Sequence, residues 1–156
     1  MKRLSATLCA LFAAIGLLSV FVATAEAQGR HRGKFYTKAD VDRVIRRVEE
    51  RSDAFRKAVD SHLDRSRLDD TRAEDNINRQ VKQLEEALDE LRSEFDRRDS
   101  WQETRANVQK VMRQSDEINA LMRRRRFGPA IENEWRLLRA DLNRLAGIYN
   151  LPQLRA

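Results

Sequence analysis

The chain has 156 residues, with 31 Lys and Arg, 25 Asp and Glu and 2 His, which gives a formal net charge of +6 at neutral pH. This length allows one ordinary domain. Aromatic residues make up only 6% of the chain, and there are 5 Gly and 2 Pro. Turn-rich β sandwiches, collagen-like chains and flexible Gly/Ser linkers are therefore disfavoured against a largely helical chain.

Residues 1–27 have the organisation of a secretory signal peptide. Lys2 and Arg3 precede an apolar run over 4–23, and Ala25-Glu26-Ala27 has small residues at the first and third positions before a cleavage site. We therefore expect export to the periplasm or secretion from the cell, with cleavage after Ala27. The alternative is a retained membrane anchor, since about 20 apolar residues can span a bilayer.

The only cysteine, Cys9, lies inside this apolar run, so the predicted mature chain has no thiol. Disulfides, thiol catalysis and Cys-ligated metal are thereby excluded from the mature form, and its stability must come from packing. Residues 28–36 follow as a flexible basic arm that contains Arg30, His31, Arg32 and Lys34.

In the remaining domain, 37–151, apolar residues recur at alternating steps of three and four in four stretches. This spacing predicts helices at about 38–64, 71–97, 101–123 and 129–149, each with one apolar seam. The first and third seams are Val41, Ile45, Val48, Ser52, Phe55, Val59 and His62, and Trp101, Thr104, Val108, Val111, Ser115, Ile118 and Met122. The cleanest seams, which we predict as the structural core, are Ile77, Val81, Leu84, Leu88, Leu91 and Phe95, and Ile131, Trp135, Leu138, Leu142, Leu145 and Tyr149.

The segments between the seams contain residues that are typical of helix ends. Three Ser/Thr-x-x-Asp/Glu pairs predict capping boxes at helix starts, namely Thr37 with Asp40, Thr71 with Glu74, and Ser100 with Glu103. Gly128-Pro129 opens the fourth helix and Pro152 closes it.

We predict an all-α fold, an antiparallel up-down four-helix bundle. Burial of one seam cannot offset the conformational entropy lost when its helix is ordered, so the helices must pack together, and short connections make consecutive helices antiparallel. Two extended hairpins that dimerise, or a three-helix core with one swapped helix, remain alternatives. A faint repeat, in which Ser52-Asp53-Ala54-Phe55 is echoed by Ser115-Asp116-Glu117-Ile118, also allows two duplicated helical hairpins.

The residues for catalysis or cofactor binding are largely missing from the sequence. There is no Glu-x-x-His or His-Glu-x-x-His pair for a metal and no glycine loop for a phosphate, so we expect no cofactor, no metal and no enzymatic activity. His62 on its seam is expected to be a hydrogen-bonding or solvated residue rather than a haem ligand. Ser52 and Ser115 lack a nearby base, so we expect each hydroxyl to bond the carbonyl one turn back and to let the first and third helices approach closely.

Most of the charge is expected to be mutually compensating. A basic side of the first helix (Arg43, Arg46, Arg47 and Arg51) faces a similar length of acidic residues on the second (Glu85, Glu86, Asp89, Glu90 and Glu94). Asp42 with Arg46, Asp53 with Lys57, and Glu94 with Arg98 have the favourable acid-first spacing on a helix.

Arg123, Arg124, Arg125 and Arg126 lack such a local acidic complement. Cations suit the end of a helix, but four arginines exceed what that end requires. Because arginine binds phosphate in a forked geometry, this cluster is our candidate anion-binding site for an anionic envelope surface. No nucleic-acid-binding motif accompanies it, so no specific nucleic acid is expected as a partner.

Two stretches carry a resemblance to other proteins. EWRLLRADLNRLAGIYNLP, from Glu134 to Pro152, resembles the ending of a set of small exported bacterial proteins, and LDRSRLDDTRAEDNIN, from Leu63 to Asn78, is similar to their middle segment. The resemblance implies a secreted helical domain and transfers no activity, catalytic residue or binding residue. The envelope stress chaperones of the Spy and CpxP type are also small, exported and helical, but their repeated L-T-x-x-Q motif does not occur here.

These observations together predict an exported, non-enzymatic helical protein that binds a protein partner or assembles with itself, with no membrane span in its mature form. Two alternatives are a binder of anionic envelope surfaces through Arg123 to Arg126 and a chaperone-like protein that captures unfolded clients on exposed apolar surface.

Overall fold

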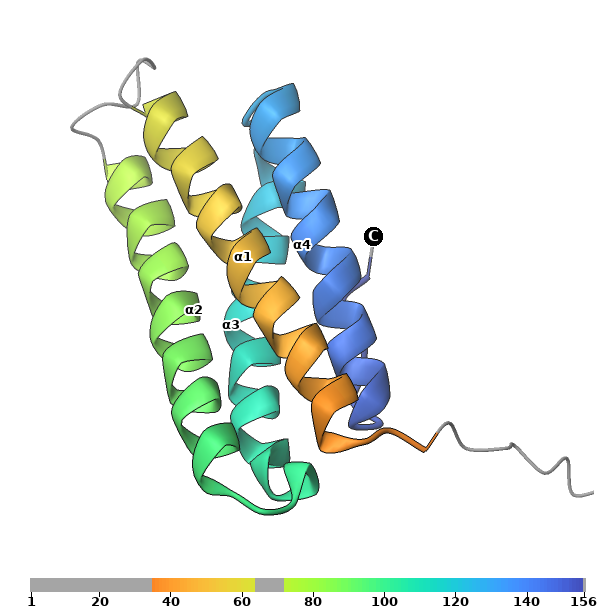
Figure 1. Ribbon diagram of the computed structural model, residues 1–156. Coiled ribbons are helices and arrows are strands. Elements are labelled where there is room, and N and C mark those ends of the chain that lie inside the picture. Colours follow the sequence, from red (N-terminus) through yellow and green to blue (C-terminus); the bar gives the residue numbers. More distant parts are fainter. Residues whose placement is uncertain (1–34, 64–71, 156) are drawn as a thin grey trace, which may run out of the picture. The chain divides into compact units, whose positions relative to one another are not determined.

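The computed structural model describes residues 35–63 and 72–155, which are helical apart from short connections (Figure 1). Helix α1 covers Lys38–Leu63, α2 covers Arg72–Arg97, a short 3-10 helix η1 covers Trp101–Thr104, α3 covers Arg105–Arg124 and α4 covers Pro129–Ile148. The described ranges contain no strand, which confirms the all-α prediction for them. The predicted signal peptide and residues 28–34 of the arm lie outside the described residues.

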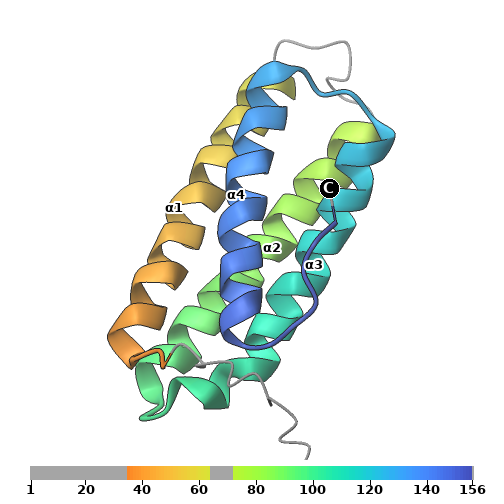
Figure 2. The same cartoon turned by 90° about the vertical axis from the view of Figure 1, so that its right-hand side faces the viewer.

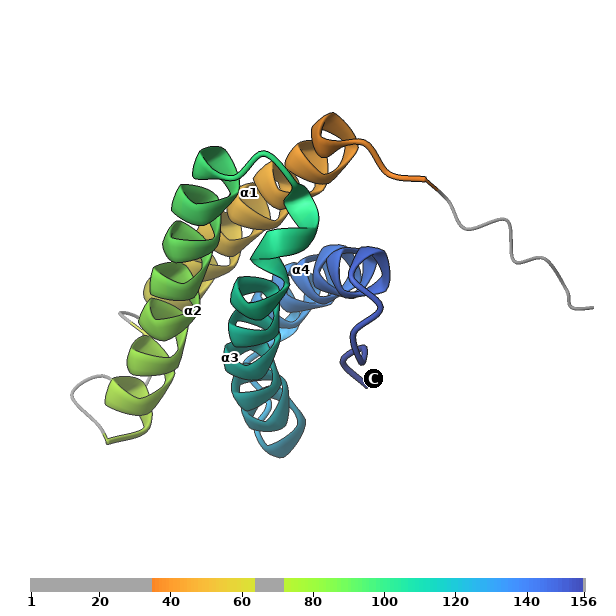
Figure 3. The ribbon, with the colours of Figure 1, turned by 90° about the horizontal axis from the view of Figure 1, so that it is seen from below.

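The helices pack in two main pairs. Contacts are most extensive between α1 and α4 and between α2 and α3, while smaller contacts join α1 to α2 and α3 to α4 (Figures 2 and 3). The expected close approach of the first and third helices is not among these main contacts. Since α1 has α2 and α4 as its neighbours, its seam meets theirs instead.

The seams of all four helices contribute to one hydrophobic cluster. Every predicted apolar residue of the second and fourth seams is buried, and the aromatic rings of Phe55 on α1 and Trp135 on α4 lie with their centroids 5.3 Å apart. A single chain thus covers the apolar side of each helix with other helices of its own, as expected when no seam is large enough to be stable alone.

The ends of two seams differ from the prediction. At the end of α1 the buried residue is Leu63, while His62 is half-buried, and near the end of α3 Met122 is half-buried. Met112, which is outside the predicted seam, is buried. An α-helix has 3.6 residues per turn, so a strict seven-residue spacing drifts around the helix by about 20° per heptad and the buried face shifts with it.

The start of α1 confirms one predicted capping box. The Asp40 backbone N–H donates to Thr37 Oγ1 over 3.1 Å, and the Thr37 N–H donates to Asp40 Oδ2 over 3.0 Å. Tyr36, one residue earlier, packs against the core, so the chain is already anchored inside the predicted arm.

The predicted capping box of Ser100 with Glu103 is wrong. The Ser100 hydroxyl bonds the side chain of Gln102, and Glu103 pairs with Arg98 instead of the helix start. The chain enters α3 through the 3-10 turn η1, where the buried Thr104 hydroxyl donates to the Trp101 carbonyl over 2.8 Å. The predicted box of Thr71 with Glu74 begins outside the described residues.

The chain after α4 is part of the core, although the predicted domain ends at 151. Asn150 has a φ of 51°, and the N–H groups of Asn150 and Leu151 donate to the carbonyls of Gly147 and Ala146 over 3.3 and 2.9 Å. This is a Schellman ending with asparagine in the left-handed position, so the helix stops before Pro152. The segment 149–155 then runs back between α3 and α4, as Figure 2 shows, and buries Leu151 and Leu154.

The side chain of Asn143 on α4 fastens this C-terminal segment. Its Oδ1 accepts the Leu154 N–H over 2.7 Å and its Nδ2 donates to the Leu154 carbonyl over 3.1 Å. Two hydrogen bonds to one residue fix both the position and the direction of the segment. The backbone N–H and carbonyl of the buried Leu154 are thereby satisfied.

Candidate anion-binding surface

The arginine cluster lies where α3 ends. Arg123 and Arg124 are the last residues of α3, Arg125 is its C-cap with extended backbone, and Arg126 follows in the connection to α4. All four are exposed, and none takes part in an ion pair with another described residue. Within the described part of the chain, the negative charge that they meet is the partial charge of the helix end.

The connection that carries these arginines is held from beneath. Phe127 is buried with 4% of its surface exposed, and Gly128 has a φ of 93°, a backbone conformation that favours glycine. Pro129 then begins α4, where its missing N–H leaves no unsatisfied donor. An aromatic anchor and a fixed turn thus set the position of Arg125 and Arg126 relative to α4.

Arginines from two helices converge on a groove beside this connection. Arg123 and Arg126 line it together with Arg136 and Arg139 of α4, and the groove has a volume of about 650 Å³. Asn119, Met122, Glu132 and Trp135 complete its lining. Arg124 and Arg125 do not line it, so the structure brings only half of the predicted cluster into this groove.

Neutral acceptors hold the two α4 arginines. Arg136 Nη2 donates to Asn133 Oδ1 over 2.8 Å, and Arg139 Nη1 donates to the Arg155 carbonyl over 3.4 Å. Asn119 Nδ2 donates to the same carbonyl over 3.0 Å. The guanidinium groups are thus partly oriented while their positive charge is not neutralised, an arrangement that suits an incoming anion.

Sequence reasoning missed Arg136 and Arg139. They are three positions apart on α4 and therefore share one helix face. Their spacing can be read from the sequence, but it indicates an anion-binding site only when the arginines at the end of α3 lie opposite. That neighbourhood is a tertiary contact between α3 and α4.

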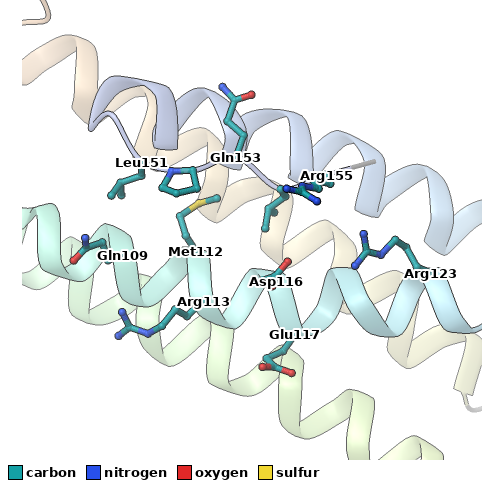
Figure 4. Close-up of a pocket in the computed structure, with 11 residues that line it drawn as sticks. Gln109, Met112, Arg113, Asp116, Glu117, Arg123, Leu151, Gln153 and Arg155 are labelled. Carbon is teal, nitrogen blue, oxygen red and sulfur yellow. The ribbon is translucent and has the colours of Figure 1, made fainter.

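A second groove, of about 730 Å³, lies between α3 and the C-terminal segment (Figure 4). Met112 and Leu151 form part of its wall, and Arg113, Asp116 and Glu117 lie along its α3 side. Its charges are of both signs, so it has no strong preference for an anion or a cation. This distinguishes it from the first groove, where four arginines outnumber one glutamate.

The charged stripes of α1 and α2 pair differently from the prediction. Arg92, which lies within the acidic stretch 85–94 of α2, bonds Glu49 with its Nε and Nη2 over 2.9 Å each and Asp42 with its Nη1 over 2.6 Å. Arg51 of the predicted basic side instead approaches Asp141 of α4 at 3.8 Å. The link made by Arg92 therefore has the reverse polarity, with the cation on α2, whereas Arg56 of α1 pairs with Glu85 of α2 in the predicted sense.

Two of the three predicted pairs within helices are formed. Asp42 bonds Arg46 over 2.9 Å, and Glu94 lies 3.2 Å from Arg98. Although burial acts in the opposite direction, the hydrogen bonds from Arg46 and Arg92 hold the pKa of Asp42 below its ordinary value. Hydrogen bonds to Glu49 and Asp42 likewise raise the pKa of the Arg92 guanidinium.

The two seam serines differ in their hydrogen bonding. Ser115 Oγ donates to the Val111 carbonyl over 2.8 Å, as predicted, whereas the same prediction is wrong for Ser52, whose buried hydroxyl has no hydrogen-bond partner among the described residues. Ser52 lines a hollow of about 250 Å³ together with Glu49, Asp53 and Arg56.

No group of three or more His, Cys, Asp or Glu side chains within 35–63 and 72–155 is arranged to hold a metal ion. None of the helices that the structure describes is both long enough and apolar enough to cross a membrane.

Comparison with known proteins finds no matching family model, no similar curated protein and no similar solved structure. The resemblance to small exported bacterial proteins therefore stays a prediction. Functional inference for this chain depends on its own residues.

Proposed function

We propose that this protein is an exported, non-enzymatic interaction protein whose contact surface is charged. The observation that carries the proposal is the group of four exposed arginines, Arg123 to Arg126, without an ion-pair partner among the described residues. Among those same residues the only large apolar side chain that is fully exposed is Phe35, at 98%. A partner that meets this part of the chain therefore encounters guanidinium groups rather than an apolar patch.

Export belongs to the same proposal. Residues 1–27 act as a signal peptide, and cleavage after Ala27 releases a periplasmic or secreted chain. The basic start, the apolar run and the Ala-x-Ala motif support this. Mass spectrometry of the chain from the exported fraction should find an N-terminus at Gln28, and a chain that begins at Met1 would contradict cleavage.

The arrangement that we propose for the helices is an antiparallel up-down four-helix bundle. It is supported by contacts between helix ends. Lys38 at the start of α1 donates to the carbonyl of Arg98, just after α2, and the side chain of Thr104, just before α3, lies 2.8 Å from the Tyr149 hydroxyl, just after α4. Such a bundle holds the end of α3 and the start of α4 at one end of the molecule.

The partner that this surface favours is anionic. Proteins of the cell envelope encounter phosphorylated lipids and acidic polysaccharides, and unpaired arginines bind such groups while releasing counterions. The chaperone alternative would need exposed apolar surface, which the described residues do not provide beyond Phe35. We therefore propose an anionic envelope surface as the binding partner.

Vesicle sedimentation of the mature protein tests this proposal. We expect it to bind vesicles that contain anionic lipid in low salt, to release as salt rises, and to ignore zwitterionic vesicles. The variant with all four of Arg123, Arg124, Arg125 and Arg126 changed to Glu should lose this binding. Because all four side chains are exposed, circular dichroism should show an unchanged fold. Equal binding by the two proteins would refute the proposal.

A further inference from the structure

We propose that the groove between the end of α3 and the first half of α4 is a binding site for a phosphate monoester. Its anion ligands are Arg123 and Arg126 on one side and Arg136 and Arg139 on the other. The inference rests on the proposed function, because it names the ligand class and the residues for part of the same arginine surface.

The site is built by two elements that meet at a fixed turn. Arg136 and Arg139 share one face of α4, while Arg123 and Arg126 belong to the end of α3 and the connection that follows it. Buried Phe127 and the positive φ of Gly128 hold that connection in place. The backbone positions that carry the four arginines are therefore fixed before any ligand arrives, which reduces the entropy lost on binding.

The charges of the groove favour a dianion over a single carboxylate. Four arginines and one glutamate line it, and the described contacts of Arg136 and Arg139 are to a side-chain amide and a carbonyl. A phosphate monoester carries a charge of about −1.5 to −2 at neutral pH and three acceptor oxygens, and guanidinium groups bind it through paired N–H donors. It can therefore engage arginines from both sides at once.

The size and the remaining lining indicate that the phosphate is attached to an organic group. A groove volume of about 650 Å³ leaves room for a group attached to the phosphate. Half-buried Met122 supplies apolar contact, and Glu132 supplies an acceptor for a hydroxyl group. A polyhydroxylated phosphate monoester, either free or as a lipid headgroup, meets all three features.

The same lining disfavours a nucleic acid. Glu132 lies within the groove and would repel a continuous row of phosphates. Trp135 is 96% covered, with 4% of its surface exposed, so it offers no platform on which a base could stack. A single phosphate placed among the arginines avoids both costs.

Nuclear magnetic resonance of the mature protein titrated with glycerol 3-phosphate tests the site. The indole N–H of Trp135, which donates to Asn119 Oδ1 over 3.3 Å beside the groove, should shift in a saturable way. The indole of Trp101 is an internal control, because it bonds the Tyr36 carbonyl and the intervening stretch of α3 places it about 20 Å or more from the groove. Equal, non-saturating shifts of both indoles would refute the site.

A matched pair of variants separates the groove from the general charge of the cluster. Arg126→Ser with Arg136→Ser removes two groove arginines, whereas Arg124→Ser with Arg125→Ser removes the same charge outside the groove. We expect the first variant to weaken glycerol 3-phosphate binding about tenfold or more and the second by about threefold or less, since salt screens charges that do not touch the ligand. Equal weakening by the two variants would overturn the proposal.

The single change Arg136→Lys keeps the charge and removes the forked donor pair. We expect it to weaken binding of glycerol 3-phosphate while leaving the protein spectrum otherwise unchanged, because Arg136 is exposed. Full retention of affinity would show that charge alone suffices and would contradict the proposed geometry.

Vesicles that contain phosphatidic acid, which also presents a phosphate monoester, identify the source of the ligand. A saturable Trp135 shift with both probes supports recognition of the headgroup itself, and a shift with glycerol 3-phosphate alone supports a site for a free molecule. No shift with either probe refutes the site.

The same measurements separate failure of the groove from failure of the charged surface. If vesicle binding persists but the two double variants weaken it equally, the groove inference fails while the proposed charged surface survives. If the protein does not bind vesicles but glycerol 3-phosphate shifts the Trp135 signal, the proposed envelope-binding surface fails while the groove inference survives.

Discussion

Two serines, Ser52 on α1 and Ser115 on α3, are both buried, but their hydroxyls differ in their hydrogen bonding. Ser115 donates to the Val111 carbonyl over 2.8 Å, while Ser52 has no hydrogen-bond partner. Burying a hydroxyl without a partner costs free energy that a satisfied hydroxyl does not cost. The two positions therefore form a natural comparison.

We expect Ser52→Ala to raise the free energy of unfolding by about 0.5–1.5 kcal/mol, because it removes an unsatisfied group and alanine is the better helix former. Ser115→Ala, the matched control, gains the same helix propensity but loses a hydrogen bond, so its change should be smaller. Urea denaturation of both variants measures this difference. A larger gain from Ser115→Ala would contradict the assignment.

Arg92 of α2 binds two carboxylates of α1, Asp42 and Glu49. Its side chain is 21% exposed, and those of Asp42 and Glu49 are 27% and 30% exposed. Removing the cation would leave two half-buried carboxylates with fewer partners, which costs more than removing an exposed pair.

We expect Arg92→Leu to lower the free energy of unfolding by about 1–3 kcal/mol. Arg56→Leu is the control, because Arg56 also bridges the two helices, to Glu85 at 2.9 Å, but its side chain is 54% exposed. Its loss should cost clearly less than the loss of Arg92, because solvent screens an exposed pair. Thermal or urea unfolding compares the two, and equal losses would count against a special role for Arg92.

At the scale of the helices, two sequence motifs of the same type behave differently. Thr37 caps α1 by accepting the Asp40 N–H, whereas Ser100 bonds Gln102 and leaves η1 without a side-chain cap. The difference arises because the chain near Ser100 enters a 3-10 turn that Thr104 and Trp101 stabilise. A capping motif thus predicts a helix start reliably only where the chain around it is free to adopt the cap geometry.

We expect Thr37→Ala to cost about 0.5–2 kcal/mol of stability, the usual cost of losing a helix cap. Ser100→Ala should cost clearly less, since no cap is lost. Chemical denaturation measures both values. If Ser100→Ala were as costly as Thr37→Ala, the hydroxyl of Ser100 would have to cap the helix in solution.

The C-terminal segment shows a further difference between local and tertiary signals. Pro152 indicates the end of a helix, yet α4 ends at Ile148, before the left-handed Asn150, and Asn143 fastens the buried Leu154 that follows. The two leucines of this segment, Leu151 and Leu154, lie outside any helix. Only the surface of α3 and α4 beneath them makes them part of the core.

For the molecule as a whole, stability should depend on pH at both extremes. A hydrogen bond from Thr37 lowers the pKa of Asp40, and hydrogen bonds from Arg46 and Arg92, which outweigh the effect of burial, lower that of Asp42. Burial raises the pKa of the Tyr149 hydroxyl, although its hydrogen bond with Thr104 acts in the opposite direction. Each shift favours the protonation state found near neutral pH.

The signs of these shifts define the expected profile. Carboxyl groups with a lowered pKa stabilise the fold above about pH 4, and this stabilisation is lost as the pH falls below that value. The Tyr149 hydroxyl stabilises the fold below about pH 10, where the unfolded side chain would ionise, and this contribution is lost as the pH rises further. We therefore expect the free energy of unfolding to be nearly constant between about pH 5 and 9.

Denaturation at a series of pH values tests this profile. Tyr149→Phe should flatten the alkaline decline, and Asp40→Asn should reduce the acid decline, although both variants are expected to be less stable at pH 7. An alkaline decline that is as steep in Tyr149→Phe as in the wild type would show that other groups, such as lysines, cause it.

Much of the fold could be predicted from local pattern. The seams of α2 and α4 are buried as expected, because an apolar residue at every third or fourth position can be hidden only on one side of a helix. The helix at Thr37 starts where its capping pair indicates. Half of the candidate groove, Arg123 and Arg126, was also visible as an uncompensated basic run.

The rest depends on which helix lies beside which. Tertiary packing sets α1 against α4, selects Arg92 as the link between α1 and α2, and brings Arg136 and Arg139 opposite the end of α3. The periodicity of one helix defines which of its faces is buried but carries no information about the neighbour that covers it. Helix positions therefore follow from near neighbours in the chain, whereas ion pairs and the groove follow from contacts between residues that are far apart in it.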